Sequence, residues 1–407
     1  MEVAYFDVDI DPDLDLDPQP LIDLSRRQNV VAGRNGMFGG VPIPDNFVLN
    51  DPNRDMYLAL SYAGAKQVLS DDENFSAHQA YAHTLGAVWG DVLLTLDRPG
   101  HTRSRQLTAK AFLHRNVQGE WQVQHVLRVI HQLIDGFADR GKGDLVQLFT
   151  AHFPFEIICG IIGVPAERRD EFSLNAHAIL NMLRDLEGAQ RGAEGCDAIT
   201  RDLMADLRVR PRPCMLLDLM DAEFERERLS EEEICRFVRF LLPAGLDTTA
   251  RSTANLLYFL LSNDLIGTVA ADRSLVGSAM EESLRMIPVG SMLPRIARRD
   301  IDVDGTMIPA GSAITACTLT GNRDQKVFAD PDRFDIRRPR KPLLSFGGGI
   351  HSCLGVALAR AELKAAFEAI LDRLPNLRPN PEHWHYVRVR GLTLRTVDSL
   401  PVVWDPS

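Results

Sequence analysis

The sequence predicts a mainly α-helical protein with a minor antiparallel β region. Two observations predict this class. Apolar residues recur at helical spacing through most of the chain after Pro99, in runs that proline or glycine interrupts. Residues 301–314 instead alternate apolar and polar side chains around Asp-Gly and Pro-Ala-Gly turns, which is typical of a small antiparallel sheet.

The N-terminal residues 1–20 are expected to form an extended acidic arm, and residues 21–407 a single domain. Residues 7–18 alternate Asp with mostly apolar residues but lack the glycine turn and the closing Glu of an EF-hand loop. A solvated arm is therefore favoured over a calcium site.

Short strands and a helix are predicted within residues 46–70. Residues 78–94 have poor periodicity and predict a long loop over a functional region. Helices are then predicted at 101–116, 120–140, 144–163, 167–188, 194–209, 230–262 and 274–286. A last helix follows Cys353, and strands are expected within residues 389–404.

The composition is that of an ordinary globular protein, with 45% hydrophobic and 25% charged residues. A net charge of -11 argues against nucleic acid as a partner. No apolar run approaches the roughly 18 residues that span a bilayer, which argues against a membrane partner. The six cysteines are scattered without a CxxC pair, which favours a reducing compartment. We expect a soluble, cytoplasmic monomer.

The segment FGGGIHSCLG, residues 346–355, places Cys353 behind three glycines and before a helix that is expected to begin near Leu354. The glycines permit a tight turn and a close approach by a flat group. Free amide groups at the helix start can stabilise a thiolate, which can hold a metal ion. The alternatives are a buried thiol in a simple loop and a phosphate loop, although the segment lacks the phosphate-binding patterns GK[ST] and GxGxxG.

The segment LLPAGLDTTARST, residues 241–253, places an acid beside an alcohol within a long helical run. Gly245 is a poor helix former, and the Thr248 hydroxyl can bond to the carbonyl of Ala244, so a local bend with a widened turn is expected. Asp247 and Thr248 can supply a proton path. Taken alone, the segment fits equally well a helix with a surface Asp and a core Thr.

Two more segments place charged or polar groups on one helix face. Glu282 and Arg285 are three residues apart, a spacing at which solvated surface pairs form. His101 and Arg105 are four residues apart on a helix that begins after Pro99. For each residue alone, an exposed position is the ordinary interpretation.

Together the four segments resemble the cytochrome P-450 family in order and spacing over nearly the whole chain. The family's specific FxxGxxxCxG haem-binding signature is matched by Phe346, Gly347, Gly349, His351, Cys353 and Gly355. The resemblance implies the cytochrome P-450 fold, a mainly helical prism with a small sheet region. It also implies haem b (iron protoporphyrin) as the cofactor, with Cys353 as the axial ligand of the iron.

The resemblance implies roles for the other segments as well. Asp247 would relay protons, and Thr248 would hydrogen-bond the activated oxygen and its waters. Glu282 and Arg285 would form a buried structural triad with Arg333. The groups that would bind the haem propionates are His101, Arg105, Arg295 and His351.

The substrate pocket is placed by the same resemblance. Its roof would be the 78–94 loop, through Tyr81, His83, Val88, Trp89 and Val92, helped by Ile179, Met182 and Leu183. Its other walls would be Leu241, Ala244, Gly290, Ser291, Met292, Thr393 and Leu394. Most of these residues are apolar, which predicts a small hydrophobic substrate. His78 and His83 are alternatives for binding a polar group, although loop histidines are usually solvated.

The implied reaction inserts one atom of dioxygen into a C-H or C=C bond and reduces the other to water. No segment resembles a flavin or nicotinamide domain, so electrons would come from an iron-sulfur ferredoxin or a flavodoxin with its NAD(P)H reductase. Residues 337–341, with Arg103, Lys110 and Arg115, can form a basic docking patch for such a partner, and an ordinary solvated loop is the alternative.

Two rival functions remain at this point. One is a peroxide-using enzyme or an isomerase of the same fold, which the intact Asp247 and Thr248 disfavour because such enzymes often lack the pair. The other is a haem module that binds a ligand or a carrier protein without turnover. Consumption of dioxygen and reduced ferredoxin in proportion to product distinguishes them from a monooxygenase.

Overall fold

The computed structural model describes residues 17–34, 36–43, 54–112, 119, 121–182 and 184–406. Most of the predicted acidic arm, the first residues of the 46–70 region, Arg115 and Leu183 lie outside these ranges. Of the arm's described residues, 19 and 20 belong to helix α1, Gln19–Ser25, and are not extended.

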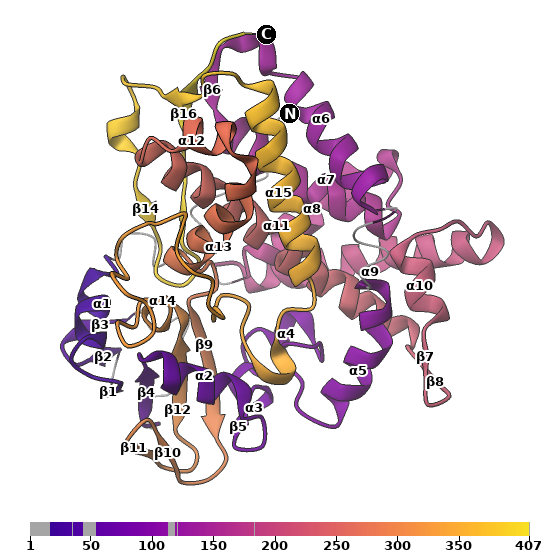
Figure 1. Ribbon diagram of the computed structural model, residues 1–407. Helices are drawn as coiled ribbons and strands as arrows, with labels where there is room; N and C mark the ends of the chain where they lie inside the picture. The colour runs from indigo at the N-terminus through magenta and orange to yellow at the C-terminus, as the bar shows by residue number, and fades with distance from the viewer. Residues whose placement is uncertain are drawn as a thin grey trace.

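Helices form most of the described chain and fill the right and upper parts of Figure 1. Their bounds are α1 Gln19–Ser25, α2 Tyr62–Ser70, α3 His78–Tyr81, α4 Gly86–Trp89, α5 Gly100–Ala109, α6 Arg128–Asp135, α7 Phe153–Ile162, α8 Arg169–Leu180, α9 Leu186–Val209, α10 Met215–Asp221, α11 Glu231–Ser262, α12 Ile266–Ala271, α13 Val276–Met286, α14 Thr318–Gly321 and α15 Val356–Arg373.

Helix α11 lies at the centre of the helical part and packs against α7, α9, α13 and α15. It begins with a capping box, in which Ser230 accepts from the Glu233 amide and Glu233 accepts from the Ser230 amide. Glutamates fill its first turn, where the helix dipole favours negative charge. The helix predicted at 230–262 is confirmed. The widened turn expected at Gly245 is wrong, because the backbone is α-helical throughout, with Pro243 inside it.

Short strands form one large sheet at the lower left of Figure 1 and several smaller sheets. Their bounds are β1 Val30–Arg34, β2 Met37–Phe38, β3 Val41–Pro42, β4 Met56–Ala59, β5 Phe75–Ser76, β6 Lys142–Asp144, β7 Glu223–Phe224, β8 Glu227–Arg228, β9 Met292–Ala297, β10 Ile301–Val303, β11 Thr306–Ile308, β12 Ala313–Cys317, β13 Arg378–Pro379, β14 Val389–Arg390, β15 Thr396–Val397 and β16 Pro401–Val403.

The largest sheet has the order β3-β2-β1-β4-β12-β9-β5. Its neighbouring strands are antiparallel except β4 and β12, which are parallel, with Met56 opposite Ala313. These two strands are far apart in the sequence, so no hairpin turn fixes their direction. The hairpin predicted within 301–314 is β10 and β11, with Ile301 opposite Ile308.

Two further regions differ from the sequence prediction. The loop expected at 78–94 contains two single helical turns, α3 and α4. Helix α9 begins at Leu186 rather than near residue 194, with Asp185 accepting from the Gly188 amide at 2.8 Å. The glycines of its first turns weaken the helical signal, whereas packing against α8 stabilises the helix. Within the described ranges, no helix is both long and apolar enough to cross a membrane.

Candidate active site

The cysteine loop connects the segment after β12 with helix α15. A short 3-10 turn covers Gly349–His351, and the Cys353 amide donates to the Phe346 carbonyl at 2.9 Å. Gly347 and Gly349 have φ of 70° and 59°, which favour glycine. A Cβ on Gly349 would also lie 2.8 Å from the Leu69 carbonyl oxygen at the end of α2. The glycines therefore fix the turn and its close packing on α2.

The Cys353 thiol lies just before α15, which begins at Val356 rather than near Leu354. Burial raises the pKa of this thiol, while the Gly355 amide and the charges of Arg105 and Arg360 act in the opposite direction. Its residue nonetheless keeps exposed surface. A thiol that is desolvated and yet keeps exposed surface is open to a metal cation, which would replace the thiol proton.

Four donor or cationic side chains lie around this loop. The rings of His101 and His351 are 4.7 Å apart, and Arg295 is buried at 3% exposure. Burial and the nearby arginines lower the pKa of His101 to about 4, and burial, Arg295 and His101 lower that of His351 to about 3. Both rings are therefore neutral near pH 7.

These groups fit a bound molecule that carries carboxylates. Among the described residues, the buried Nε2 of His101 has no hydrogen-bond partner and Arg295 forms no ion pair. A buried guanidinium without a carboxylate is costly, so a ligand that supplies negative oxygens is favoured here. Haem propionates meet this requirement, and the Cys353 thiol meets that of the iron.

Arg105 connects helix α5 to the cysteine loop. Its Nη1 donates to the carbonyls of Ser352 at 2.7 Å and Ile350 at 3.2 Å. His351 in turn bonds through Nδ1 to the Leu93 carbonyl at 3.1 Å. The four predicted propionate-binding residues therefore surround the same loop, with Arg105 bonded to the loop's own backbone.

The predicted acid and alcohol are adjacent on α11. Thr248 donates from Oγ1 to the Ala244 carbonyl at 2.7 Å, as the sequence predicted. Asp247 is buried, and both of its oxygens lie 2.8 Å from Nε of Arg251. Sequence reasoning missed Arg251, although its position four residues after an Asp on a helix is a signal for an ion pair.

The predicted pocket walls meet beside this helix. Ala244 is exposed and Gly245 partly exposed, although the helix is mostly buried. Gly290 pairs with Leu394, and the Ser291 amide donates to the Thr393 carbonyl at 3.0 Å, so these two wall segments are joined. Met292 continues into β9.

The predicted roof also contacts α11. Trp89 stacks at a tilt on Phe240, with ring centroids 5.5 Å apart, directly before Leu241. Val88 is buried beside it at 4% exposure. The structure thus brings the roof and the oxygen-side helix together.

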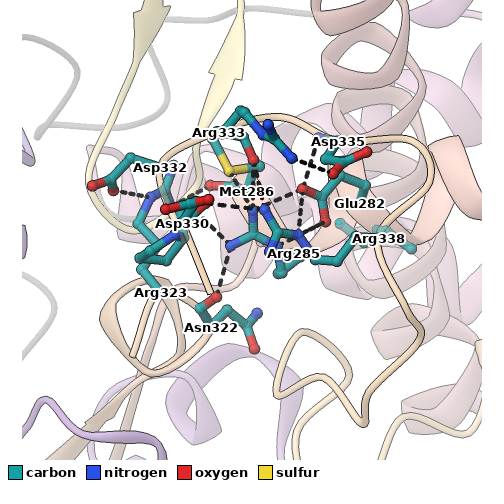
Figure 2. Close-up of polar contacts among 12 residues, drawn as sticks. Glu282, Arg285, Met286, Asn322, Arg323, Asp330, Asp332, Arg333, Asp335 and Arg338 are labelled. Atoms are coloured by element: carbon teal, nitrogen blue, oxygen red, sulfur yellow. Dashed lines mark hydrogen bonds and ion pairs between the residues drawn. The ribbon is translucent and has the colours of Figure 1, made fainter. Parts of the chain in front are cut away.

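The predicted structural triad is partly wrong. Glu282 and Arg285 pair at 2.8 Å and are buried, but the third side chain on Glu282 is Arg338, whose Nε lies 2.9 Å from Oε1 (Figure 2). Arg333 contributes its carbonyl to both arginines, while its exposed guanidinium pairs with Asp335 at 2.7 Å. The chain turns between the two positions, so residue 333 points outward and residue 338 inward.

Two arginines of the predicted basic docking patch are paired with carboxylates. Arg338 is occupied by Glu282, and Arg103 pairs with Glu227 and, at 2.6 Å, with Glu233. Lys110 donates to the Glu223 carbonyl. Arg115 lies outside the described residues, and Arg337 and Arg340 are exposed, so the docking surface stays a prediction.

Comparison with known proteins identifies relatives along most of the chain. The family model described as cytochrome P-450 matches residues 270–381. Mycinamicin IV hydroxylase/epoxidase of Micromonospora griseorubida is 36% identical over 317 residues, which are 77% of this chain and 79% of that protein. The 6-deoxyerythronolide B hydroxylase of Saccharopolyspora erythraea is 31% identical over 371 residues, 86% of this chain and 91% of that protein.

Solved structures agree with these relatives. Cytochrome P-450 CYP109Q5 from Chondromyces apiculatus has a TM-score of 0.83 and 26% identity, covering 99% of this chain and 98% of that one. A mutant of the mixed-function P-450 MycG, in complex with mycinamicin V, has a TM-score of 0.81 and 31% identity over 96% of this chain and 97% of that one. With a donor set that fits haem, this chain belongs to the cytochrome P-450 family and is a haem-containing monooxygenase.

Proposed function

We propose that this monooxygenase hydroxylates or epoxidises a small hydrophobic natural product, with electrons from a separate ferredoxin or flavodoxin and its NAD(P)H reductase. The observation that carries the substrate class is the exposed Ala244 on the mostly buried helix α11. The buried Leu241 lies one turn before it and directly follows Phe240, on which Trp89 of the roof packs. The names of the relatives support it, since one hydroxylates or epoxidises mycinamicin IV and another hydroxylates 6-deoxyerythronolide B.

We assign the residues of the chain as follows. Cys353 ligates the haem iron, and His101, Arg105, Arg295 and His351 surround the propionates. The haem supplies dioxygen activation when it is bound. Phe346, Gly347 and Gly355 shape the cysteine loop, and Arg360 lies over the Phe346 ring at 4.9 Å.

Proton transfer is assigned to the acid and the alcohol of α11. Thr248 Oγ1 can rotate its proton toward the pocket because it is only partly buried, and Asp247 lies next to it in the sequence. The Ala244 side chain leaves room above the helix. The apolar roof at Val88 and Trp89 excludes bulk water from this space.

The electron partner, compartment and assembly are also proposals. A separate electron partner is proposed because a P-450 structure covers 99% of this sequence, and no segment of the sequence resembles a flavin or nicotinamide domain. All six cysteines are free thiols, which suits a reducing cytoplasm. We propose a monomer as the working state. The intact pair Asp247 and Thr248 continues to favour monooxygenation over the peroxide-using and binding-only alternatives.

The first test is the absorption spectrum of the dithionite-reduced protein with carbon monoxide. A Soret band shifted far to the red is expected, because a cysteine thiolate donates electron density to the iron. A histidine-type band, or a protein that holds no haem, would refute the assignment of Cys353. Titration with apolar compound libraries, macrolides included, then tests the substrate class through spin-state changes.

Replacing His101 by Asn is expected to speed haem loss by about 10- to 100-fold. The reason is that Nε2 is buried without a partner, and a hydrogen bond to a charged group contributes about 1.5–3 kcal/mol. Transfer of haem to apomyoglobin measures the rate. The matched control is His83→Asn in the exposed part of the roof, which should leave the rate unchanged. Equal rates for wild type and H101N would remove His101 from the propionate site.

The haem-free protein is expected to lose stability as the pH falls from 6.5 toward 4. Since burial lowers the pKa of His101 from 6.5 to about 4, the unfolded chain binds a proton in this window that the folded chain does not. The free energy of unfolding therefore falls by up to about 1.4 kcal/mol per pH unit at this residue. Urea unfolding across this range should show a shallower pH slope for H101N than for wild type. An unchanged slope would contradict the prediction.

A further inference from the structure

Arg251 is among the largest side chains that are completely buried, and although it lies within the 241–253 segment, no role was predicted for it from the sequence. It lies one helical turn after Asp247 on α11, and its Nε reaches both carboxylate oxygens at 2.8 Å. The ion pair is buried on both sides, with 0% and 8% exposure of the two side chains. Such a pair is held rigidly because separating the partners would leave a buried charge that water does not reach.

The same guanidinium also contacts the pocket wall. Arg251 Nη1 donates to the Leu394 carbonyl at 3.1 Å, and Leu394 pairs with Gly290 of the facing wall segment. Asn255, one turn further along α11, donates to the Arg395 carbonyl at 3.0 Å. The C-terminal segment is therefore attached to α11 directly beside the acid.

We propose that Arg251 is a positioning residue that fixes the Asp247 carboxylate beside Thr248 and ties it to the substrate wall at Leu394. This inference rests on the proposed monooxygenase function. In that reaction two electrons and two protons convert dioxygen and a C-H bond into a C-OH group and water. When protons arrive in the wrong place, the same two electrons and two protons leave with dioxygen as hydrogen peroxide.

Arg251 thereby determines what share of the electrons goes to product and water and what share goes to hydrogen peroxide. A carboxylate whose two oxygens share the Nε donor of a buried arginine is restrained from turning away from Thr248. Misplacement by about 1 Å can cost a large factor in rate. Because Arg251 also bonds to the Leu394 carbonyl, a displacement of this wall segment would also displace the Asp247 carboxylate. Arg251 does not itself touch the reacting atoms.

A matched control pair lies on the same helix. Arg239 pairs through Nη1 with Asp197 of α9 at 3.2 Å, and both side chains are nearly buried, at 11% and 8% exposure. Arg239 lies twelve residues before Arg251 and nine before Thr248 on this helix. Loss of either arginine breaks a buried ion pair of α11, but only Arg251 holds the acid.

The experiment compares holoenzyme carrying Arg251→Gln, Arg251→Lys or Arg239→Gln with wild type. One measurement is the infrared stretching band of carbon monoxide bound to the reduced protein, which responds to the charges around the pocket and needs neither substrate nor electron partner. The other is hydrogen peroxide formed per NADPH oxidised, with a plant-type ferredoxin and its reductase as the electron source.

We expect R251Q to shift the carbon monoxide band and to raise the hydrogen peroxide formed per NADPH oxidised by roughly tenfold. R251K keeps the charge but cannot bond to both Asp247 and the Leu394 carbonyl, so the carbon monoxide band and the peroxide yield should change less than in R251Q. If R251Q does not fold, R251K provides the test. R239Q should match wild type.

A wild-type band and peroxide ratio in the Arg251 variants, or the same changes in R239Q, would overturn the inference. Failure of the proposed function is distinguishable, because the wild-type protein would then lack the red-shifted Soret band with carbon monoxide.

Discussion

Replacing Cys353 by Ser is expected to abolish the red-shifted Soret band of the reduced carbon monoxide complex and to reduce monooxygenation to the background level. A serine hydroxyl stays protonated near neutral pH and cannot supply the electron density of a thiolate. The fold should survive, since the thiol lies in an accessible loop position and the change conserves volume. We expect the free energy of unfolding of the haem-free protein to change by less than about 1 kcal/mol. Spectroscopy and urea unfolding measure the two effects.

The control for this change is Cys214→Ser. Cys214 is a half-buried free thiol before α10, and burial raises its pKa as it does that of Cys353. Its replacement should keep the band and the activity. If C214S lost the band, or if C353S kept it, the iron ligand would have to be sought among other residues.

The parts of the site that local sequence could predict are those in which spacing alone sets the geometry. Helical spacing places Thr248 one turn after Ala244, and the observed bond between them was predicted from it. The Glu282 and Arg285 spacing gave the correct pair in the same way. The three glycines before Cys353 predicted a tight turn. The backbone has such a turn, with a φ of 70° at Gly347, a conformation that favours glycine.

The parts that failed depend on irregular backbone. Arg333 and Arg338 are both plausible in sequence, and only the turn between them decides that Arg338 points to Glu282. The parallel pairing of β4 with β12 joins distant segments and leaves no local signal. Charge counting predicted a basic patch at Arg103, whereas the fold brings Glu233 against it. Arg251 had a local signal, the spacing from Asp247, but nothing in the sequence indicated that the pair is buried.

The buried triad is expected to produce the largest stability effect among single substitutions. Replacing Glu282 by Gln leaves Arg285 and Arg338 without their carboxylate, although both guanidiniums are largely buried, at 1% and 11% exposure. An uncompensated buried charge costs about 3–5 kcal/mol. The neutral amide also loses an acceptor oxygen for these arginines and for the Asp335 amide, which lies 3.0 Å from Oε1. Urea unfolding of the purified variant measures the loss.

The neighbouring residue gives the control. Glu281 lies on the same helix and pairs with Arg360 at 2.7 Å, but at the surface, with 43% of the arginine exposed. Glu281→Gln should cost no more than about 1 kcal/mol because solvent screens such pairs. Similar losses for E281Q and E282Q would mean that burial of the triad contributes little.

The loss at Glu282 should extend to haem binding, because the triad's helix also supports the cysteine loop. Ser345, directly before Phe346, donates to the Leu284 carbonyl at 2.7 Å and accepts from Asn322 at 2.9 Å. Asn322 in turn provides a carbonyl for Arg285 at 3.0 Å. When the guanidinium of Arg285 loses its carboxylate and shifts, both supports of Ser345 shift with it. E282Q is therefore expected to release haem faster than E281Q, even under conditions in which both variants remain folded.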